Sequence, residues 1–87
     1  MDNHANAAEV LKTLGNPTRI DIVKALLHGE VCVSELQHRL GIPQSTVSQH
    51  LRLLRDRGIV RERQDGTRRC YRLVSEQVRR VMASVGE

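Results

Sequence analysis

Residues 34–71 read SELQHRLGIPQSTVSQHLRLLRDRGIVRERQDGTRRCY, and this stretch decides the fold. Two segments with helical spacing of their apolar residues flank the turn Gly41-Ile42-Pro43. A segment rich in arginine follows, and the dipeptide Asp65-Gly66 within it is typical of a β-hairpin turn. Two short helices followed directly by a basic hairpin indicate a helix-turn-helix with a wing, a layout that reads DNA.

Capping residues, glycine stops and apolar periodicity predict the other elements. Helices are expected at about 3–14, 17–28, 34–40, 44–57 and 75–85, and strands at about 31–33, 59–64 and 67–73. Ser34 with Gln37 three residues later forms a capping-box pattern, which predicts that Ser34 caps the third helix. The expected fold is mostly α-helical with a small β-hairpin wing, about five helices and two or three short strands, in one domain spanning residues 1–87.

The charge of the chain is unevenly distributed. Residues 1–50 carry four Lys/Arg against five Asp/Glu, a sum of −1, whereas residues 51–87 carry ten Arg against five Asp/Glu, a sum of +5. A basic second half that includes a hairpin favours double-stranded DNA as the partner over a merely solvated face. The sequence shows no apolar run of membrane-spanning length and no signal peptide in residues 1–8, so we expect a cytoplasmic protein without a membrane partner.

The helix expected at 44–57 has one apolar and one polar face. Val47, Leu51 and Leu54 form the packing stripe. Small hydroxyl side chains let a helix enter the major groove, and Gln can pair with adenine through two hydrogen bonds. The residues expected to read bases are Gln44, Ser45, Ser48 and Gln49, and those expected at the DNA backbone are His50, Arg52, Arg68 and Arg69. For His50, a hydrogen bond within the fold is the equal alternative.

Apolar stripes on the first and last predicted helices exceed what so small a domain covers easily. They are formed by Val10, Leu11, Leu14, Val78, Val81, Met82 and Val85. Because Tyr71 is the sole aromatic residue, the core is aliphatic and marginal, and help from a second subunit is expected. These stripes therefore predict a homodimer interface, with packing inside one chain as the alternative.

The chain resembles the ArsR/SmtB family of small winged-helix repressors over about residues 7–82. The matching motifs are Asn16-Pro17-Thr18-Arg19, Val31-Cys32-Val33-Ser34-Glu35-Leu36, Gln44-Ser45-Thr46-Val47-Ser48-Gln49-His50-Leu51, Leu54, and Gly66 with Tyr71-Arg72-Leu73. The resemblance implies a homodimer that binds an imperfect palindrome, represses transcription and leaves DNA when an inducer binds. Pro43 departs from the family, which often has a capping Ser there.

The metal sites of that family are mostly missing from this sequence. Ser34 replaces the second thiol of the arsenite-type Cys-Val-Cys pattern, and residues 74–87 contain no His for the zinc-type site on the last helix. Asp2 and His4 are the only potential ligands near the N-terminus. We therefore predict no metal site of these types.

Cys32 and Cys70 form the remaining candidate sensor. In winged folds the short strand before the reading motif often pairs with the second wing strand, which would place the two thiols about 5 Å apart at their Cβ atoms. Nearby arginines would lower a thiol pKa and favour the thiolate. The pair is a candidate for a reversible disulfide or a two-thiolate site for a soft metalloid, and two inert packed thiols are the alternative.

Two other classes of function compete with inducible repression. An enzyme is not expected, because the chain has no nucleophile–base pair at a supporting spacing and no glycine-rich phosphate loop. A winged-helix protein–protein adaptor is disfavoured by the arginine-rich wing and the scarcity of aromatic residues. A DNA-binding regulator without an inducer stays open.

Overall fold

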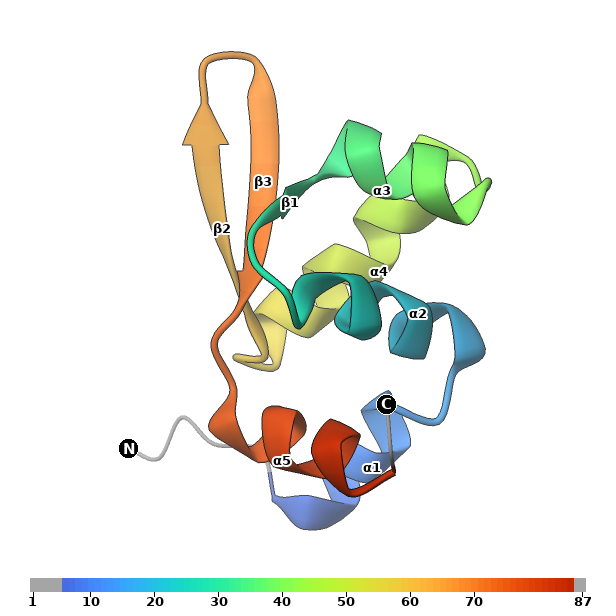
Figure 1. Cartoon of the computed structure of the whole chain (residues 1–87), viewed down its shortest axis with the longest axis vertical. Helices are drawn as coiled ribbons and strands as arrows, with labels where there is room; N and C mark the ends of the chain where they lie inside the picture. Colours follow the sequence, from blue (N-terminus) through green and yellow to red (C-terminus); the bar gives the residue numbers. More distant parts are fainter. Residues whose placement is uncertain (1–5, 86–87) are drawn as a thin grey trace.

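The computed structural model describes residues 6–85 and has the architecture of a winged helix-turn-helix (Figure 1). Its elements within that range are α1 (Ala7–Thr13), α2 (Pro17–Leu26), β1 (Val31–Cys32), α3 (Val33–Leu40), α4 (Gln44–Asp56), β2 (Val60–Asp65), β3 (Arg68–Leu73) and α5 (Glu76–Ser84). The predicted fold class, mostly helical with a small wing, is confirmed. The predicted start of the first helix near Asn3 is wrong: the helix begins at Ala7, because Asn6 is extended and its side chain accepts a hydrogen bond from the backbone N–H of Glu9 as the N-cap.

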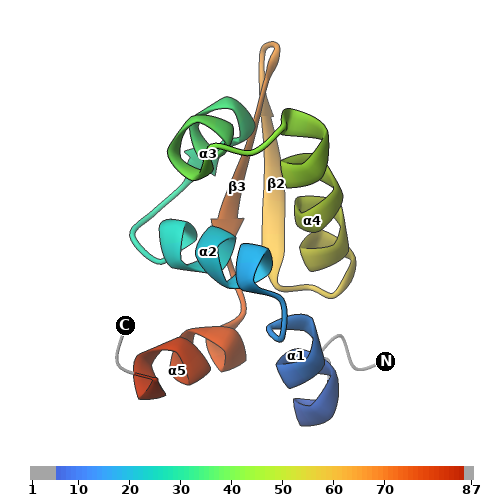
Figure 2. The same ribbon diagram turned by 90° about the vertical axis from the view of Figure 1, so that its right-hand side faces the viewer.

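The three strands form one antiparallel sheet in the order β1-β3-β2. Strands β2 and β3 make the wing, a hairpin that projects at one end of the molecule (Figures 1 and 2). Its turn lies between the paired residues Asp65 and Arg68, and Gly66 has the positive φ of 63° that favours glycine there. The Asp65-Gly66 signal was therefore a correct indicator of the hairpin.

An aliphatic core joins these elements. Val47, Leu51 and Leu54 of α4 are all 0% exposed, which confirms that they form the packing stripe of that helix. The single aromatic residue, Tyr71, is also buried in this core. Helices α1 and α5 lie at the end opposite the wing tip (Figure 2). The core thus anchors α4 with its polar face outward, and it sets the wing beside that helix.

Two expectations about the third helix were wrong. The helix begins at Val33 rather than after Ser34, its N-cap is Cys32, and no side chain caps it. Cys32 is held in β1 opposite Cys70, and the buried Val33 belongs to the core, so the chain passes from strand to helix without a capping residue. Strand β1 ends at Cys32, one residue earlier than expected, because Val33 already belongs to α3.

The other boundaries differ from expectation by one or two residues. Helix α2 ends at Leu26 instead of near His28, and Gly29 follows with a φ of 135°. Asn16 caps α2, because its side chain accepts hydrogen bonds from the backbone N–H groups of Thr18 and Arg19. Ser75 caps α5 by accepting from the backbone N–H of Val78. Local capping chemistry thus placed the starts of α2 and α5 correctly.

Candidate nucleic-acid interface

The N-terminal turn of α4 presents an uncapped polar face. Pro43 occupies the N-cap position and makes no side-chain cap hydrogen bond, as expected from its missing hydroxyl. Its carbonyl oxygen accepts from the backbone N–H groups of Thr46 and Val47, both at 3.1 Å, so the helix forms without the capping Ser. Gln44, Ser45 and Gln49 are exposed and Ser48 is half-buried. The helix N-terminus therefore offers backbone N–H groups and small polar side chains on one surface.

A groove of about 240 Å³ separates this face from the wing. Its walls are formed by Cys32, Val33, Ser34, Gln44, Ser48, Gln64, Thr67, Arg68 and Arg69. The structure thus brings two predicted base-reading residues, Gln44 and Ser48, to the same hollow as two predicted backbone-contacting arginines. Ser45 and Gln49 do not line it, and lie on the exposed outer face of α4.

Three polar residues of this groove were missed by the sequence reasoning. The sequence predicts a capping role for Ser34 and places Gln64 and Thr67 only within the wing strands and their turn. These residues line the groove because the hairpin packs against the start of α3. No short-range sequence pattern predicts that packing. The turn at Asp65-Gly66 was the available signal for Thr67, because it places that residue at the wing tip.

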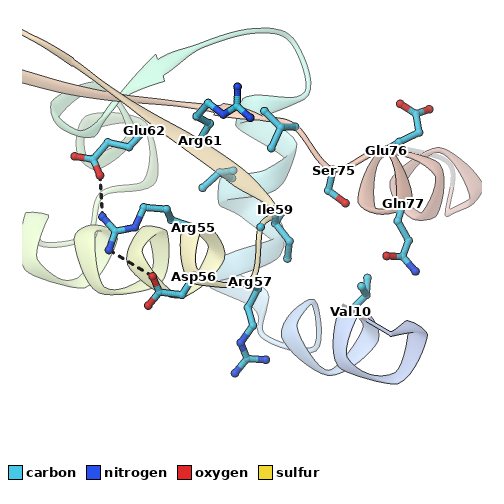
Figure 3. A pocket seen from close by; sticks show the side chains of 13 residues that line it. Val10, Arg55, Asp56, Arg57, Ile59, Arg61, Glu62, Ser75, Glu76 and Gln77 are labelled. Atoms are coloured by element: carbon cyan, nitrogen blue, oxygen red, sulfur yellow. Dashed lines mark hydrogen bonds and ion pairs between the residues drawn. The ribbon is translucent and has the colours of Figure 1, made fainter. Parts of the chain in front are cut away.

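Ion pairs fix the wing relative to α4. The Glu62 carboxylate accepts from Arg55 of α4 at 2.8 Å and pairs with Arg69 of β3 at 3.1 Å. Figure 3 shows Arg55 reaching between Glu62 and Asp56, along the wall of a second hollow of about 680 Å³. Both carboxylates hold the pKa of the Arg55 guanidinium above its usual value, Glu62 more strongly. Glu62 therefore pairs with one arginine of the wing, Arg69.

Arg68 differs from Arg69 in its surroundings. Within residues 6–85 Arg68 forms no ion pair with a carboxylate, and its guanidinium donates to Sγ of Cys32 at 3.2 Å. Its side chain is exposed at the end of the hairpin, as is Arg69. Arg52 is exposed on α4 as well. Arg68 is thus a wing cation that forms no ion pair in this part of the chain, although Asp65 lies opposite it in the strand register and its charge acts on Glu30.

His50 is engaged within the fold. Its Nδ1 lies 3.4 Å from the Arg19 guanidinium, while Arg19 Nε donates to the Thr13 carbonyl at 2.6 Å. Burial, and secondarily the positive charge of Arg19, lower the pKa of His50 below its ordinary value. The neutral ring with Nδ1 as acceptor fits this contact. His50 therefore makes a contact within the fold, which is one of the two alternatives that the sequence left open. A contact of His50 with the DNA backbone stays a prediction.

Cys32 and Cys70 are cross-strand neighbours, as expected, and a disulfide joins them. Both are buried, with exposed fractions of 7% and 1%, and Cys32 contributes to the wall of the groove between α4 and the wing. The sulfur pair therefore lies directly beneath Arg68 and next to the surface that would face DNA.

The residues predicted to form the dimer interface fall into two groups. Val10, Leu14, Val78 and Met82 are buried inside this chain and belong to its core, so they pack internally as the alternative reading proposed. Leu11 and Val85 are 60% and 61% exposed, and Val81 is half-buried. The exposed members remain available on α1 and α5 for a second copy of the chain.

Neither a metal cluster nor a membrane-spanning helix is found in the described part of the chain. Residues 6–85 contain no group of three or more His, Cys, Asp or Glu side chains placed to hold a metal ion. Asp2 and His4 lie outside these residues. No helix in this range is long and apolar enough to cross a bilayer.

Comparison with known proteins identifies the family. The model of the family described as "Bacterial regulatory protein, arsR family" matches residues 16–62, more than half of the chain. The chain belongs to the ArsR family. Members of the ArsR family are DNA-binding transcriptional regulators, which agrees with the expectation that the chain is not an enzyme.

Relatives of similar sequence are found in archaea and bacteria. An HTH-type transcriptional regulator of Methanocaldococcus jannaschii is 39% identical over 88 residues, which cover 100% of this chain and 99% of the regulator. The biofilm growth-associated repressor of Xylella fastidiosa is 45% identical over 74 residues, covering 84% of this chain. The aligned region is 65% of that repressor's length, so the repressor is a longer protein.

Solved ArsR-like structures share the fold. The chain resembles reduced HlyU from Vibrio cholerae with a TM-score of 0.84 and 38% identity, over 90% of this chain and 83% of that one. It resembles the transcriptional repressor BigR from Xylella fastidiosa with a TM-score of 0.85 and 38% identity, over 90% and 80% of the two chains.

Proposed function

We propose that this ArsR-family protein is a sequence-specific transcriptional repressor that binds a palindromic operator as a homodimer. The observation that carries the proposal is the groove in which Gln44 and Ser48 of α4 face Arg68 of the wing. In this arrangement the helix N-terminus enters the major groove, and Gln44, Ser45, Ser48 and Gln49 read base edges. The wing arginines hold the adjacent phosphates and fix the register of the helix.

Dimerisation supplies the second half of the operator contact. Leu11, Val81 and Val85 leave apolar surface on α1 and α5, at the end of the molecule opposite the wing tip (Figure 2). An isologous interface there would place both wings on the outside of the dimer. The two copies of α4 would then meet successive major grooves, about 34 Å apart.

A thiol-directed signal is the proposed inducer. Two thiols at Cys32 and Cys70 would lose two protons and two electrons to a peroxide, which is reduced to two waters, and the disulfide forms. Alternatively, the two thiolates would bind a soft metalloid. Arg68 supports this coupling because its guanidinium contacts Cys32 Sγ, so a change at sulfur alters the position or charge environment of a phosphate-binding side chain.

We further propose that residues 1–87 form one domain and that the protein is cytoplasmic. The core that runs from Val10 to Met82 supports the first inference, and DNA as partner supports the second. A reducing cytoplasm suits a disulfide that forms only under oxidant.

The test is operator selection from random duplexes followed by affinity measurements at fixed salt. The proposal expects a selected palindrome, a dimer in solution, and weaker binding after either peroxide or a trivalent arsenical when the thiols start reduced. The matched control is a Cys32→Ser/Cys70→Ser protein, which should bind the operator and ignore both reagents. A monomer with no preferred sequence would contradict the proposal, and would favour a protein-binding adaptor instead.

The second candidate function is activation of transcription, instead of repression, through the same binding to DNA. The transcriptional activator HlyU of Vibrio cholerae is 40% identical to this chain over 77 residues. A reporter placed behind the selected operator separates the two, because a repressor lowers its expression and an activator raises it.

A further inference from the structure

A basic groove at the base of the wing lies outside the surface proposed to meet DNA. It has a volume of about 690 Å³ and is built from the end of α2, the base of β2 and β3, and α5. Its floor is apolar, and four arginines and two glutamates stand around it. Its lining includes Leu26, Leu27, Arg61, Arg72, Leu73 and Arg79.

Two of these arginines face one another across the hairpin. Arg61 of β2 pairs with Arg72 of β3 in the strand register, so their Cβ atoms are within about 5.5 Å on the same face of the sheet. Both side chains are exposed, and within residues 6–85 neither forms an ion pair with a carboxylate. Like charges placed directly opposite destabilise a hairpin unless an anion lies between them. In Figure 3 Arg61 points away from Arg55, whereas Glu62 points toward it.

A third guanidinium comes from α5. Arg79 makes two long hydrogen bonds, both 3.4 Å, to the carbonyl oxygens of Leu27 and Leu73. Both distances are longer than a usual N–H···O hydrogen bond. Most of the five N–H donors of this guanidinium therefore remain available to a ligand in the groove. Its neighbour Arg80 takes another direction and pairs with Glu76 instead.

The two acids of the groove are already engaged. Glu30 accepts two hydrogen bonds from Arg63, at 2.7 and 2.9 Å, and this contact lowers the Glu30 pKa below its ordinary value. Glu62 is held by Arg55 and Arg69. The charge of Arg72 also acts on Glu30. Within residues 6–85, however, none of the three guanidinium groups of Arg61, Arg72 and Arg79 forms an ion pair with either acid, and all three line one hollow.

This cluster is too far from the wing tip to serve the same phosphate as Arg68. The Arg61–Arg72 pair lies four residues along the hairpin from the Asp65–Arg68 pair. At about 3.3 Å per residue that is about 13 Å. The positive charge of Arg61 and Arg72 at the base of the wing is therefore not explained by the phosphate proposed for Arg68 at its tip.

We propose that this groove binds a small organic dianion, with its charged end between Arg61, Arg72 and Arg79 and its apolar part on the leucine floor. Guanidinium forks match both phosphate and carboxylate oxygens, so phosphomonoesters and dicarboxylates share the required chemistry. The groove volume lies within the range of small-molecule sites. Because the site touches both the wing and α5, its ligand would connect the DNA-facing hairpin with the helix proposed to form the dimer.

The experiment is calorimetric titration of the whole chain at constant ionic strength, without DNA. Phenyl phosphate and phthalate are the two probes, and inorganic phosphate measures the contribution of the apolar part. We expect saturable binding of one probe molecule per chain, with phenyl phosphate or phthalate binding more tightly than inorganic phosphate. The preferred probe then distinguishes a phosphate from a dicarboxylate source.

Matched variants assign the site. Arg79→Gln and the double variant Arg61→Gln/Arg72→Gln should each weaken binding at least about tenfold, because each removes charge-assisted hydrogen bonds. Arg80→Gln changes the net charge by the same amount as Arg79→Gln, one residue away, and should leave binding unchanged. The double variant relieves the repulsion between opposed cations, so its melting temperature without probe should equal or exceed that of the unaltered protein.

Three results would overturn this inference. They are no saturable binding of either organic probe, equal weakening by Arg80→Gln and Arg79→Gln, or probe-free DNA affinity that falls as far in the double variant as in Arg68→Ala. The last result would assign the groove to the DNA backbone. The titration contains no DNA, so its outcome is independent of the proposed repressor function.

Discussion

Replacing Arg68 by alanine should remove one phosphate contact from each wing of the DNA-bound dimer. Arg68 is suited to phosphate because, within residues 6–85, no carboxylate pairs with it. Arg69, its neighbour, must exchange a 3.1 Å ion pair with the half-buried Glu62 before it can bind phosphate. Arg68→Ala is therefore expected to change the salt dependence of DNA binding more than Arg69→Ala.

The size of the effect follows from counterion release. The slope of log K against log salt is about −0.9 for each neutralised phosphate. Two wings lose one contact each, so the slope should become shallower by about 1.8. Between 50 and 200 mM salt, the unaltered protein should then lose about twelvefold more affinity than the variant. The loss should be similar for cognate and unrelated duplexes, since phosphate contacts carry no sequence information.

Fluorescence anisotropy with a labelled duplex, titrated at several salt concentrations, measures both slopes. Arg80→Ala is the charge control, because Arg80 lies on α5 at the end opposite the wing tip (Figure 2). Glu62→Gln frees Arg69 and should make the slope steeper than that of the unaltered protein. Equal slopes for the unaltered protein and Arg68→Ala would show that Arg68 does not touch phosphate, and would refute this account of the wing.

The other predictions concern specificity, the disulfide and pH. Gln44→Ala should cost about 1–3 kcal/mol on the cognate site and relax base preference in a selection assay; unchanged preference would remove Gln44 from the reading surface. Reducing the Cys32–Cys70 bond, which closes a loop of 38 residues, should lower the free energy of unfolding by about 4 kcal/mol on loop entropy, measured by urea unfolding with and without reductant. The folded state lowers the His50 pKa, so it binds fewer protons than the unfolded chain, and stability should fall as pH drops through the ordinary value of 6.5. His50→Gln should flatten that part of the melting-temperature profile, and an unchanged profile would contradict the assignment.

The reading helix was predictable because its signals are local. The apolar spacing of Val47, Leu51 and Leu54 fixed which face packs, and so which face carries Gln44 and Ser48. Asp65-Gly66 indicated the hairpin for the same reason, since a turn depends on the conformations of adjacent residues. The opposition of Cys32 and Cys70 was also predictable, because the strand order of a winged fold pairs the segments that contain them.

The capping pattern at Ser34 shows where local signals fail. Its spacing to Gln37 suits a capping box, yet the helix begins earlier because Cys32 is paired with β3 and Val33 is drawn into the core. The apolar stripes of α1 and α5 fail in another way. Periodicity identifies which residues become buried. It does not show whether Val78 packs inside its own chain or against a second one. Only the packed structure shows that Val78 is buried internally while Val85 is exposed.

The sequence by itself determined the winged helix-turn-helix, the polar face of α4 and the basic hairpin, because each depends on periodicity, capping or turn chemistry within a few residues. The tertiary structure decided which arginines are neutralised, which of the apolar residues on α1 and α5 stay exposed, and how Arg61, Arg72 and Arg79 come to surround one groove. These contacts join residues far apart in the chain, and their energies depend on distances that only the packed fold sets.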